Sequence, residues 1–183
     1  MSTRNRCGGF TLLEVMVALI ITSIGLLGIA KIQALAYAST TSASVRSMVA
    51  IQAAGLAASM HANRTYWAAG AAPVPLTITG TVISDATLNG TAATPNYCVL
   101  GSGNTPCTSQ MIAAFDLHTW AKSLNTLLGS SNPVTTITCP VAIPVNCTIQ
   151  ITWNERAVGI NAQSQAATTT TTFAPTYTLY VEP

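Results

Sequence analysis

Residues 8–19 read Gly-Gly-Phe-Thr-Leu-Leu-Glu-Val-Met-Val-Ala-Leu, and this stretch decides the expected fold. Glu14 is the only charged side chain between Arg6 and Lys31, and the run that contains it, residues 10–30, is otherwise uncharged and mostly apolar. A carboxylate costs roughly 2.5–3.5 kcal/mol near the centre of a bilayer helix and less near its end. A segment that only crossed a membrane would not need this charge, so the stretch predicts a membrane helix with a second task.

Residues 10–30 are long enough to cross a hydrocarbon core, because a helix rises about 1.5 Å per residue and the core is about 30 Å thick. An ordinary secretory signal peptide is the alternative, with a small-residue cleavage site among the alanines of residues 34–38. The junction of Gly9 with Phe10, and Glu14 inside the apolar region, favour the membrane helix over that alternative.

The helix is expected to continue to about Arg64, because the first proline is Pro73. Beyond Lys31 its pattern becomes amphipathic, which predicts one stripe packed on a globular domain. That stripe consists of Val45, Val49, Leu56 and Met60.

The rest of the chain predicts an α+β fold, in which the long helix packs on a small antiparallel sheet beside a second helix. The second helix should begin at Thr108 and end at Gly129. Strands are expected at residues 76–83, 135–139, 147–153 and 177–181, joined as a meander by short connections. Asn89-Gly90 is expected to be a turn, and residues 166–172 a loop or an exposed edge.

Charge and motif content argue against nucleic-acid binding and against an enzyme. Two of the seven basic side chains lie in residues 1–9, and without them five basic and five acidic side chains remain. No cluster of Lys and Arg marks a nucleic-acid footprint. His61 and His118 have no metal-ligand spacing, so no metal or other cofactor is expected, and no motif joins Asp116 and Glu155 as an acid–base pair.

Cys7 lies near the N-terminus, and four more cysteines follow, at Cys98, Cys107, Cys139 and Cys147. An even number in an exported chain suggests two disulfides, for which three connectivities exist. Local pairing, Cys98–Cys107 and Cys139–Cys147, is favoured because short loops close at a smaller entropic cost. Four free buried thiols are the alternative.

The N-terminal segment resembles the class III signal of type IV prepilins. In that family a short basic leader, here with Arg4 and Arg6, ends in Gly and is followed by Phe and by Glu at the fifth position after the cut. Four downstream stretches resemble minor pilins of the PilV kind, namely residues 23–33, 60–64, 116–129 and 147–153. The proline that major pilins often carry in the membrane helix is absent, which fits a minor pilin.

The resemblance implies a leader at residues 1–9, a transmembrane and fibre-core helix at 10–30, an amphipathic continuation at 31–65 and a periplasmic domain at 66–183. It implies cleavage after Gly9 by prepilin peptidase, N-methylation of Phe10, and residence in the inner membrane with a single pass before entry into the fibre. It also gives Glu14 an assembly role, in which the carboxylate pairs with the new amine of a neighbouring subunit. A pair within one subunit is the alternative, because Phe10 and Glu14 are four residues apart on one helix.

The function that the resemblance implies is that of a minor pilin in pilus assembly or initiation, which would support twitching motility and adhesion. Its expected partners are other minor and major pilins through the N-terminal helix, with a tip adhesin as a further candidate. Two alternatives stay open: a pseudopilin of type II secretion, which has the same helix, and a DNA-binding competence pilin. The neutral charge of the chain without residues 1–9 argues against the last.

Overall fold

The computed structural model describes residues 10–91, 106–156 and 172–183. The chain forms two compact units, Met1–Thr41 and Ser42–Pro183. The helices are α1 (Leu12–Ala62), α2 (Arg64–Trp67), α3 (Ala86–Thr91) and α4 (Ser109–Leu128), and a 3-10 turn, η1, follows at Gly129–Ser131. The strands are β1 (Leu76–Thr79), β2 (Val82–Ile83), β3 (Val134–Thr138), β4 (Cys147–Thr152), β5 (Glu155–Arg156), β6 (Thr172–Phe173) and β7 (Thr176–Val181).

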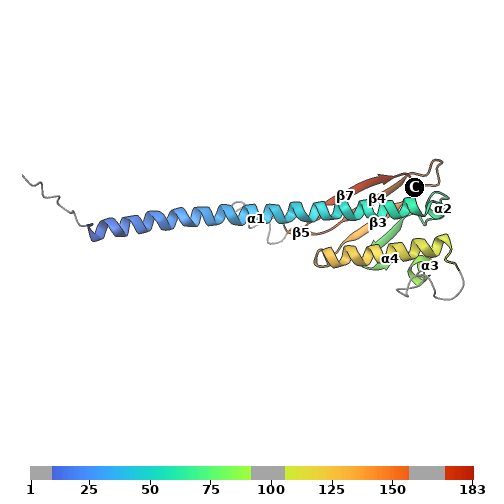
Figure 1. The fold of residues 1–183 in the computed structure, drawn as a ribbon, viewed down its shortest axis with the longest axis horizontal. Helices are drawn as coiled ribbons and strands as arrows, with labels where there is room; N and C mark the ends of the chain where they lie inside the picture. Colours follow the sequence, from blue (N-terminus) through green and yellow to red (C-terminus); the bar gives the residue numbers. More distant parts are fainter. Residues whose placement is uncertain (1–9, 92–105, 157–171) are drawn as a thin grey trace, which may run out of the picture. The chain divides into compact units, whose positions relative to one another are not determined.

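The second unit is built on a five-stranded antiparallel sheet in the order β2-β1-β3-β4-β7 (Figure 1). The side chains of β4, which lies between β3 and β7, alternate between a buried and a more exposed face, as the period of two predicts. Ile149 lies opposite Ile137 on one side and opposite Leu179 on the other, which sets the register of three strands on the buried face. One face of the sheet is therefore covered, and the opposite face is polar.

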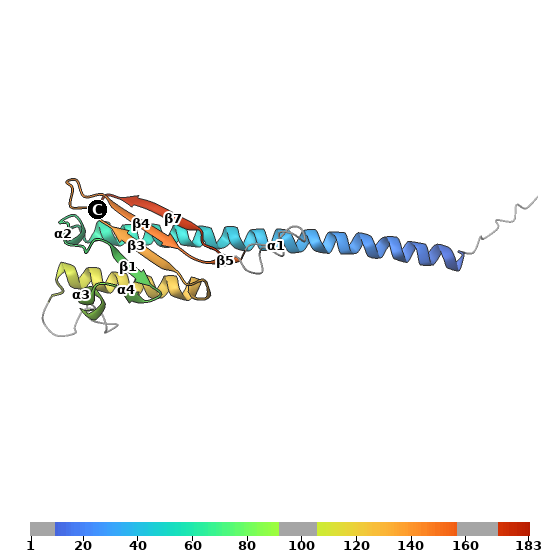
Figure 2. The ribbon, with the colours of Figure 1, turned by 180° about the vertical axis from the view of Figure 1, so that it is seen from behind.

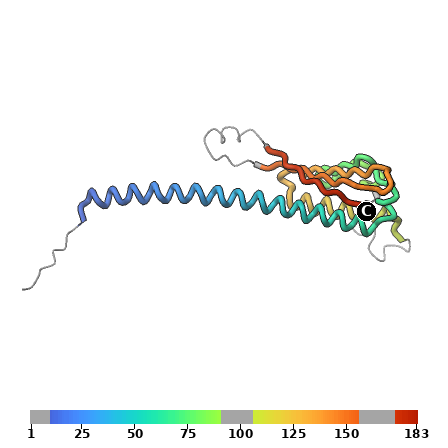
Figure 3. The backbone as a smooth tube through the Cα atoms, turned by 90° about the horizontal axis from the view of Figure 1, so that it is seen from above, coloured from blue at the N-terminus to red at the C-terminus, as the bar shows by residue number. Residues whose placement is uncertain are grey.

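Both long helices cover that same face. In the described part of residues 42–183, α1 and α4 lie side by side on one side of the sheet (Figure 3). The Nε1–H of Trp120 on α4 donates to the backbone carbonyl oxygen of Gln52 on α1 at 2.8 Å, which joins the two helices directly. This arrangement confirms the predicted α+β fold of a long helix packed on an antiparallel sheet with a second helix.

The buried stripe of α1 is close to the predicted one. Val49, Leu56 and Met60 are at most 1% exposed, and Val45 is partly buried against the same core. Ala53 completes the stripe and was missed, because its small side chain carries little weight in an apolar pattern although it is fully buried here. Ala62 ends the helix, and the side-chain amide of the buried Asn63 donates to the Ser109 carbonyl oxygen at 2.7 Å, tying this end to the start of α4.

The boundaries of α4 confirm the predicted helix. The Thr108 hydroxyl accepts a hydrogen bond from the Met111 N–H at 3.3 Å, which is the N-cap that its sequence indicates, and Gly129 is the C-cap. The side chains of α4 that face the core are centred on Leu117, and Phe115 is partly buried.

Two local predictions were wrong. Residues 76–83 form a hairpin of β1 and β2, because Gly80 adopts a positive φ of 60° and reverses the chain. Asn89-Gly90 lies within α3 and is not a separate turn. The Asp85 carboxylate accepts the Leu88 N–H at 2.8 Å and so caps that helix, and Leu88 anchors it in the core.

A second, two-stranded sheet of β5 and β6 was not predicted. It pairs Glu155 with Phe173, and its strands are too short to leave a periodic pattern in the sequence. The predicted loop at residues 166–172 lies mostly outside the described residues, and Thr172 belongs to β6.

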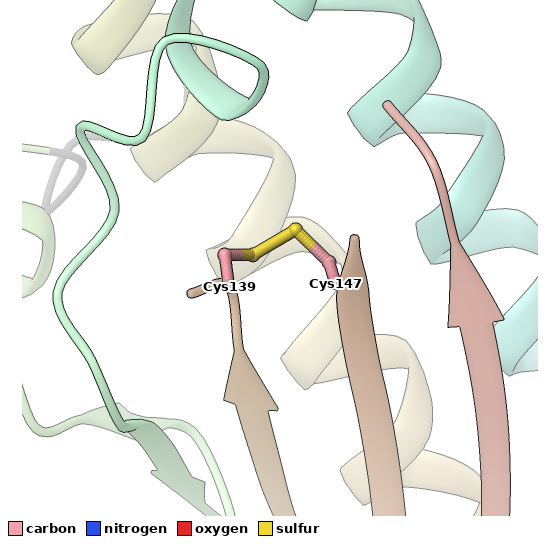
Figure 4. The surroundings of a disulfide bond; sticks show 2 residues. All are labelled: Cys139 and Cys147. Atoms are coloured by element: carbon pink, nitrogen blue, oxygen red, sulfur yellow. A yellow bond between two sulfur atoms is a disulfide. The ribbon is translucent and has the colours of Figure 1, made fainter. Parts of the chain in front are cut away.

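The disulfide Cys139–Cys147 joins the end of β3 to the start of β4 (Figure 4). It confirms one of the two predicted pairings, and both cysteines are buried. The bond closes the β3–β4 connection, in which Val141 and Ile143 are 78% and 97% exposed. Cys98 lies outside the described residues, so its pairing with Cys107 stays a prediction.

We expect simultaneous Cys139→Ser and Cys147→Ser substitution to lower the free energy of unfolding by about 2–3 kcal/mol, the chain-entropy value for a loop of this length. Urea denaturation of both proteins measures it, and non-reducing peptide mapping of the native protein is the control. An unchanged unfolding midpoint would show that the loop is already held in place by its strands.

Candidate functional site

The first unit presents its apolar side chains to the outside. Among the described residues, α1 is the helix long and apolar enough to span a membrane, with the apolar stretch in its N-terminal part. Large apolar side chains are exposed on every side there, including Leu12, Leu19, Ile24 and Leu27, each more than 60% exposed. A helix satisfies its own backbone hydrogen bonds, so this surface suits hydrocarbon or the apolar surface of neighbouring helices.

Most polar side chains in this stretch are satisfied within the helix. The Thr22 hydroxyl donates to the Ala18 carbonyl oxygen at 2.9 Å, and the Ser23 hydroxyl donates to the Leu19 carbonyl oxygen at 2.7 Å. These bonds let both hydroxyls enter an apolar environment at little cost. Within the described residues, the carboxylate of Glu14 has no hydrogen-bond or ion-pair partner, which distinguishes it from both.

Thr11 fixes the backbone around Glu14. The Glu14 N–H donates to the Thr11 carbonyl oxygen at 3.1 Å and to its hydroxyl at 3.3 Å, which caps the first turn of α1. Thr11 and Glu14 have the Thr-x-x-Glu spacing of a capping box, a signal in the sequence that the pattern analysis overlooked. Glu14 lies in the first turn of α1, and its side chain is exposed.

Phe10 and Glu14 lie on the same flank of α1. Both line a shallow concavity of about 420 Å³, together with Val15, Ala18, Leu19 and Thr22. Phe10 is 82% exposed, so an aromatic ring and a carboxylate stand together on an otherwise apolar surface. Gly9 lies outside the described residues. In the uncut chain the Phe10 nitrogen is an amide, so the amine with which Glu14 is predicted to pair arises only on cleavage.

A second polar cluster, which the sequence analysis missed, lies within residues 42–183. The Glu155 carboxylate accepts hydrogen bonds from the Arg46 Nη2 at 2.9 Å, the Trp153 Nε1 at 2.9 Å and the Ser42 hydroxyl at 3.1 Å. Burial raises the pKa of Glu155, but these hydrogen bonds and the charge of Arg46 outweigh it, so the pKa lies below its usual value. The cluster joins β5 to α1 through Ser42 and Arg46, which lie at the start of the second unit.

The remaining candidates do not form a reactive site. The His118 Nε2 lies 3.2 Å from the Asn89 carbonyl oxygen and is partly buried, so it is a satisfied rim histidine as predicted. His61 is exposed, and burial raises the pKa of Asp116 on α4. Glu155 is already engaged by Arg46. Among the described residues, no three His, Cys, Asp or Glu side chains gather as metal ligands.

Comparison with known proteins gives one match, confined to the N-terminus. Residues 4–30 match the family described as the prokaryotic N-terminal methylation motif. No curated protein and no solved structure matches the chain. The match contains Phe10 and Glu14, so it coincides with the flank described above.

We expect Glu155→Gln to lower the thermal midpoint at neutral pH, because a neutral amide loses the charge-assisted bonds to Arg46. Since the folded-state pKa of Glu155 lies below 4.5, this stabilisation is present above that value and is lost as the pH falls through the folded-state pKa. Melting curves of both proteins should therefore differ at neutral pH and converge in acid. Glu182→Gln, at an exposed carboxylate, is the matched control; an equal effect at both positions would contradict the role of the cluster.

Proposed function

We propose that this chain, whose N-terminal segment carries the methylation motif of type IV pilins and pseudopilins, is a minor pilin that contributes to assembly and initiation of a type IV pilus. Through the pilus it would support twitching motility and adhesion. The proposal takes the motif together with Glu14 as its main support.

The motif itself has firm consequences. It implies processing by prepilin peptidase and assembly among pilins, and it belongs to a family of non-enzymatic structural proteins. The apolar N-terminal helix is consistent with anchoring in the inner membrane before assembly. The position within the fibre and the subtype belong to the proposal.

Within the described residues the carboxylate of Glu14 has no partner, and this observation carries the proposed assembly role. After cleavage at Gly9, the amine of Phe10 is a positive charge on the same flank. Two opposite charges in an apolar assembly attract strongly, but each loses its hydration on entry. When Glu14 meets the amine of a neighbouring subunit, both losses are offset only after docking, so the pair sets the register of neighbouring helices more than it adds stability.

A type II secretion pseudopilin would use the same segment in the same way. Deletion of the gene separates the two functions, because loss of a minor pilin removes or thins surface pili, whereas loss of a pseudopilin blocks release of exported proteins. A DNA-binding competence pilin is disfavoured by the balance of five basic and five acidic side chains outside residues 1–9.

We expect Gly9→Leu to leave the precursor uncut, because the proposed cleavage site has no side-chain bulk on its leader side. Arg4 and Arg6 should still hold the leader in the cytoplasm, so membrane insertion should continue. Mass spectrometry of the membrane-bound protein measures the outcome, with Ser2→Ala as a control in the leader. Normal maturation of Gly9→Leu would refute cleavage at this junction.

We expect Glu14→Ala to insert and to be cleaved normally, because an apolar residue replaces a costly charge and the junction is untouched. Incorporation into the fibre should fall at least about tenfold, since the neighbour's amine then loses its partner in an apolar environment. The measurement is the ratio of mature protein in sheared pili to that in the inner membrane.

Thr22→Ala is the matched control, because the Thr22 hydroxyl is satisfied within its own helix and its loss should not change incorporation. Incorporation of Glu14→Ala at the level of the control would refute the docking role and favour a pair within one subunit. Accumulation of a mature, membrane-trapped form would support it.

A further inference from the structure

The strand β7 leaves one edge of the main sheet open. It pairs with β4 along its length, and among the described residues no strand pairs with its other side. The opposite edge of the sheet is formed by β2, which has only two residues, whereas β7 extends from Thr176 to Val181. An open edge of this length is a row of unpaired backbone donors and acceptors.

The register shows which backbone groups face outward. Thr152 lies opposite Thr176, and the next pair, Trp153 and Pro175, is joined by a hydrogen bond from the Trp153 N–H to the Pro175 carbonyl oxygen at 3.3 Å. Hydrogen-bonded and non-hydrogen-bonded pairs alternate along an antiparallel ladder. Tyr177, Leu179 and Val181 therefore bond to β4, and the N–H and C=O groups of Thr176, Thr178 and Tyr180 point away from the sheet.

The sequence of β7 lacks the usual protection of an edge. Thr-Tyr-Thr-Leu-Tyr-Val contains no Lys, Pro, Gly or charged side chain, and it is rich in residues that favour strands. Pro175 and Pro183 flank the strand but do not interrupt it. Tyr180 is 75% exposed, so among the described residues the edge is accessible as well as unpaired.

A groove of about 700 Å³ lies beside this edge, between β7 and the flank of α1. Its α1 side consists of three alanines and two basic side chains, Ala54, Ala57, Ala58, His61 and Arg64, the last at the start of α2. Alanines leave space above the helix for side chains supplied from outside. The groove therefore offers room where an additional strand would place its inward-facing side chains.

The two basic side chains of the groove, His61 and Arg64, lie near the C-terminal end of β7. The β7 arrow points toward the C-terminal end of α1 in two opposite views (Figures 1 and 2), so its C-terminus lies near His61 and Arg64. Glu182 also borders the groove there, and within the described residues it forms no ion pair with either side chain. The guanidinium of Arg64 is available to a carboxylate at that end.

We propose that the outer edge of β7 binds an extended segment of a second protein chain, antiparallel to β7, with a carboxylate near its N-terminal end and small apolar side chains toward α1. The carboxylate meets Arg64, and the apolar side chains cover the alanines. Alternate residues of a strand are about 6.8 Å apart and a helical turn is about 5.4 Å, so two successive inward side chains span little more than one turn of α1. The proposal stands on residues 42–183 and does not depend on the proposed function.

The test uses the full chain in detergent micelles and a fluorescent peptide, N-acetyl-Glu-Thr-Val-Thr-Val-Thr amide, with anisotropy and NMR amide exchange as measurements. On binding, exchange of the Thr178 and Tyr180 amides should slow, because these N–H groups gain acceptors. Exchange of the Leu179 amide, already bonded to β4, should stay the same. Binding without slower exchange at Thr178 and Tyr180 would overturn the proposal, as would the absence of binding.

Thr178→Pro removes one outward N–H and spares the ladder with β4, and it should weaken binding about tenfold, as the loss of a hydrogen bond at a desolvated edge predicts. Thr178→Val keeps the N–H and should bind within about twofold of the native protein. Equal affinities of the two variants would contradict strand pairing. Where Thr178→Pro lowers the melting temperature, the amide exchange of the native protein decides the question alone.

Arg64→Glu should weaken binding about fivefold, and a peptide with Lys in place of Glu should restore it, because the opposite charges are then exchanged. A failure of this rescue would overturn the assignment of the carboxylate to Arg64. The Thr178 and Tyr180 amides could also exchange slowly without peptide, with protection that increases with protein concentration. That result would show a second copy of this chain on the edge and would overturn the proposed occupant.

Discussion

The globular unit depends on the burial of one stripe of α1 against the sheet. Val49, Ala53, Leu56 and Met60 are at most 1% exposed, and they cover a sheet face that would otherwise be open to water. Truncating a buried side chain of this size to Ala typically costs about 2–5 kcal/mol, which is a large share of the roughly 5–15 kcal/mol by which a domain is stable. Packing of this stripe on the sheet therefore supplies a large share of the stability of the globular unit.

The same helix has two kinds of surface. In its N-terminal part large apolar side chains are exposed on all sides, and the hydroxyls of Thr22 and Ser23 bond to the backbone. From Val45 onward only one stripe is apolar and buried. The first kind of surface suits an environment that is apolar in every direction, and the second suits water on one side and protein on the other. Glu14 is the exception in the first part, and this contrast supports the assembly role proposed for its carboxylate.

Local chemistry explains which parts of the fold could be predicted. The strict alternation of β4 and the start of α4 at Thr108 depend on residues that are adjacent in the sequence, and both were predicted. The hairpin at Gly80 and the helix α3 depend on interactions that a periodic pattern does not contain: a positive φ, and a cap from Asp85 reinforced by burial of Leu88. The cluster of Arg46 and Glu155 joins residues 109 positions apart, so only the folded chain reveals it. In the N-terminal segment, by contrast, the informative residues are neighbours, and one short stretch contains the methylation motif that residues 4–30 match.

The disulfide also has a consequence for how the molecule responds to tension. A chain pulled between α1 and its C-terminus lengthens as strands detach, and each freed residue adds up to about 3.5 Å. Cys139 and Cys147 are eight positions apart, so the bond withholds roughly 28 Å of contour length from that extension. The withheld segment joins the two strands at the middle of the sheet, β3 and β4. Even a stretched subunit keeps these two strands joined at one end, which leaves a short path back to the native register when the force is released.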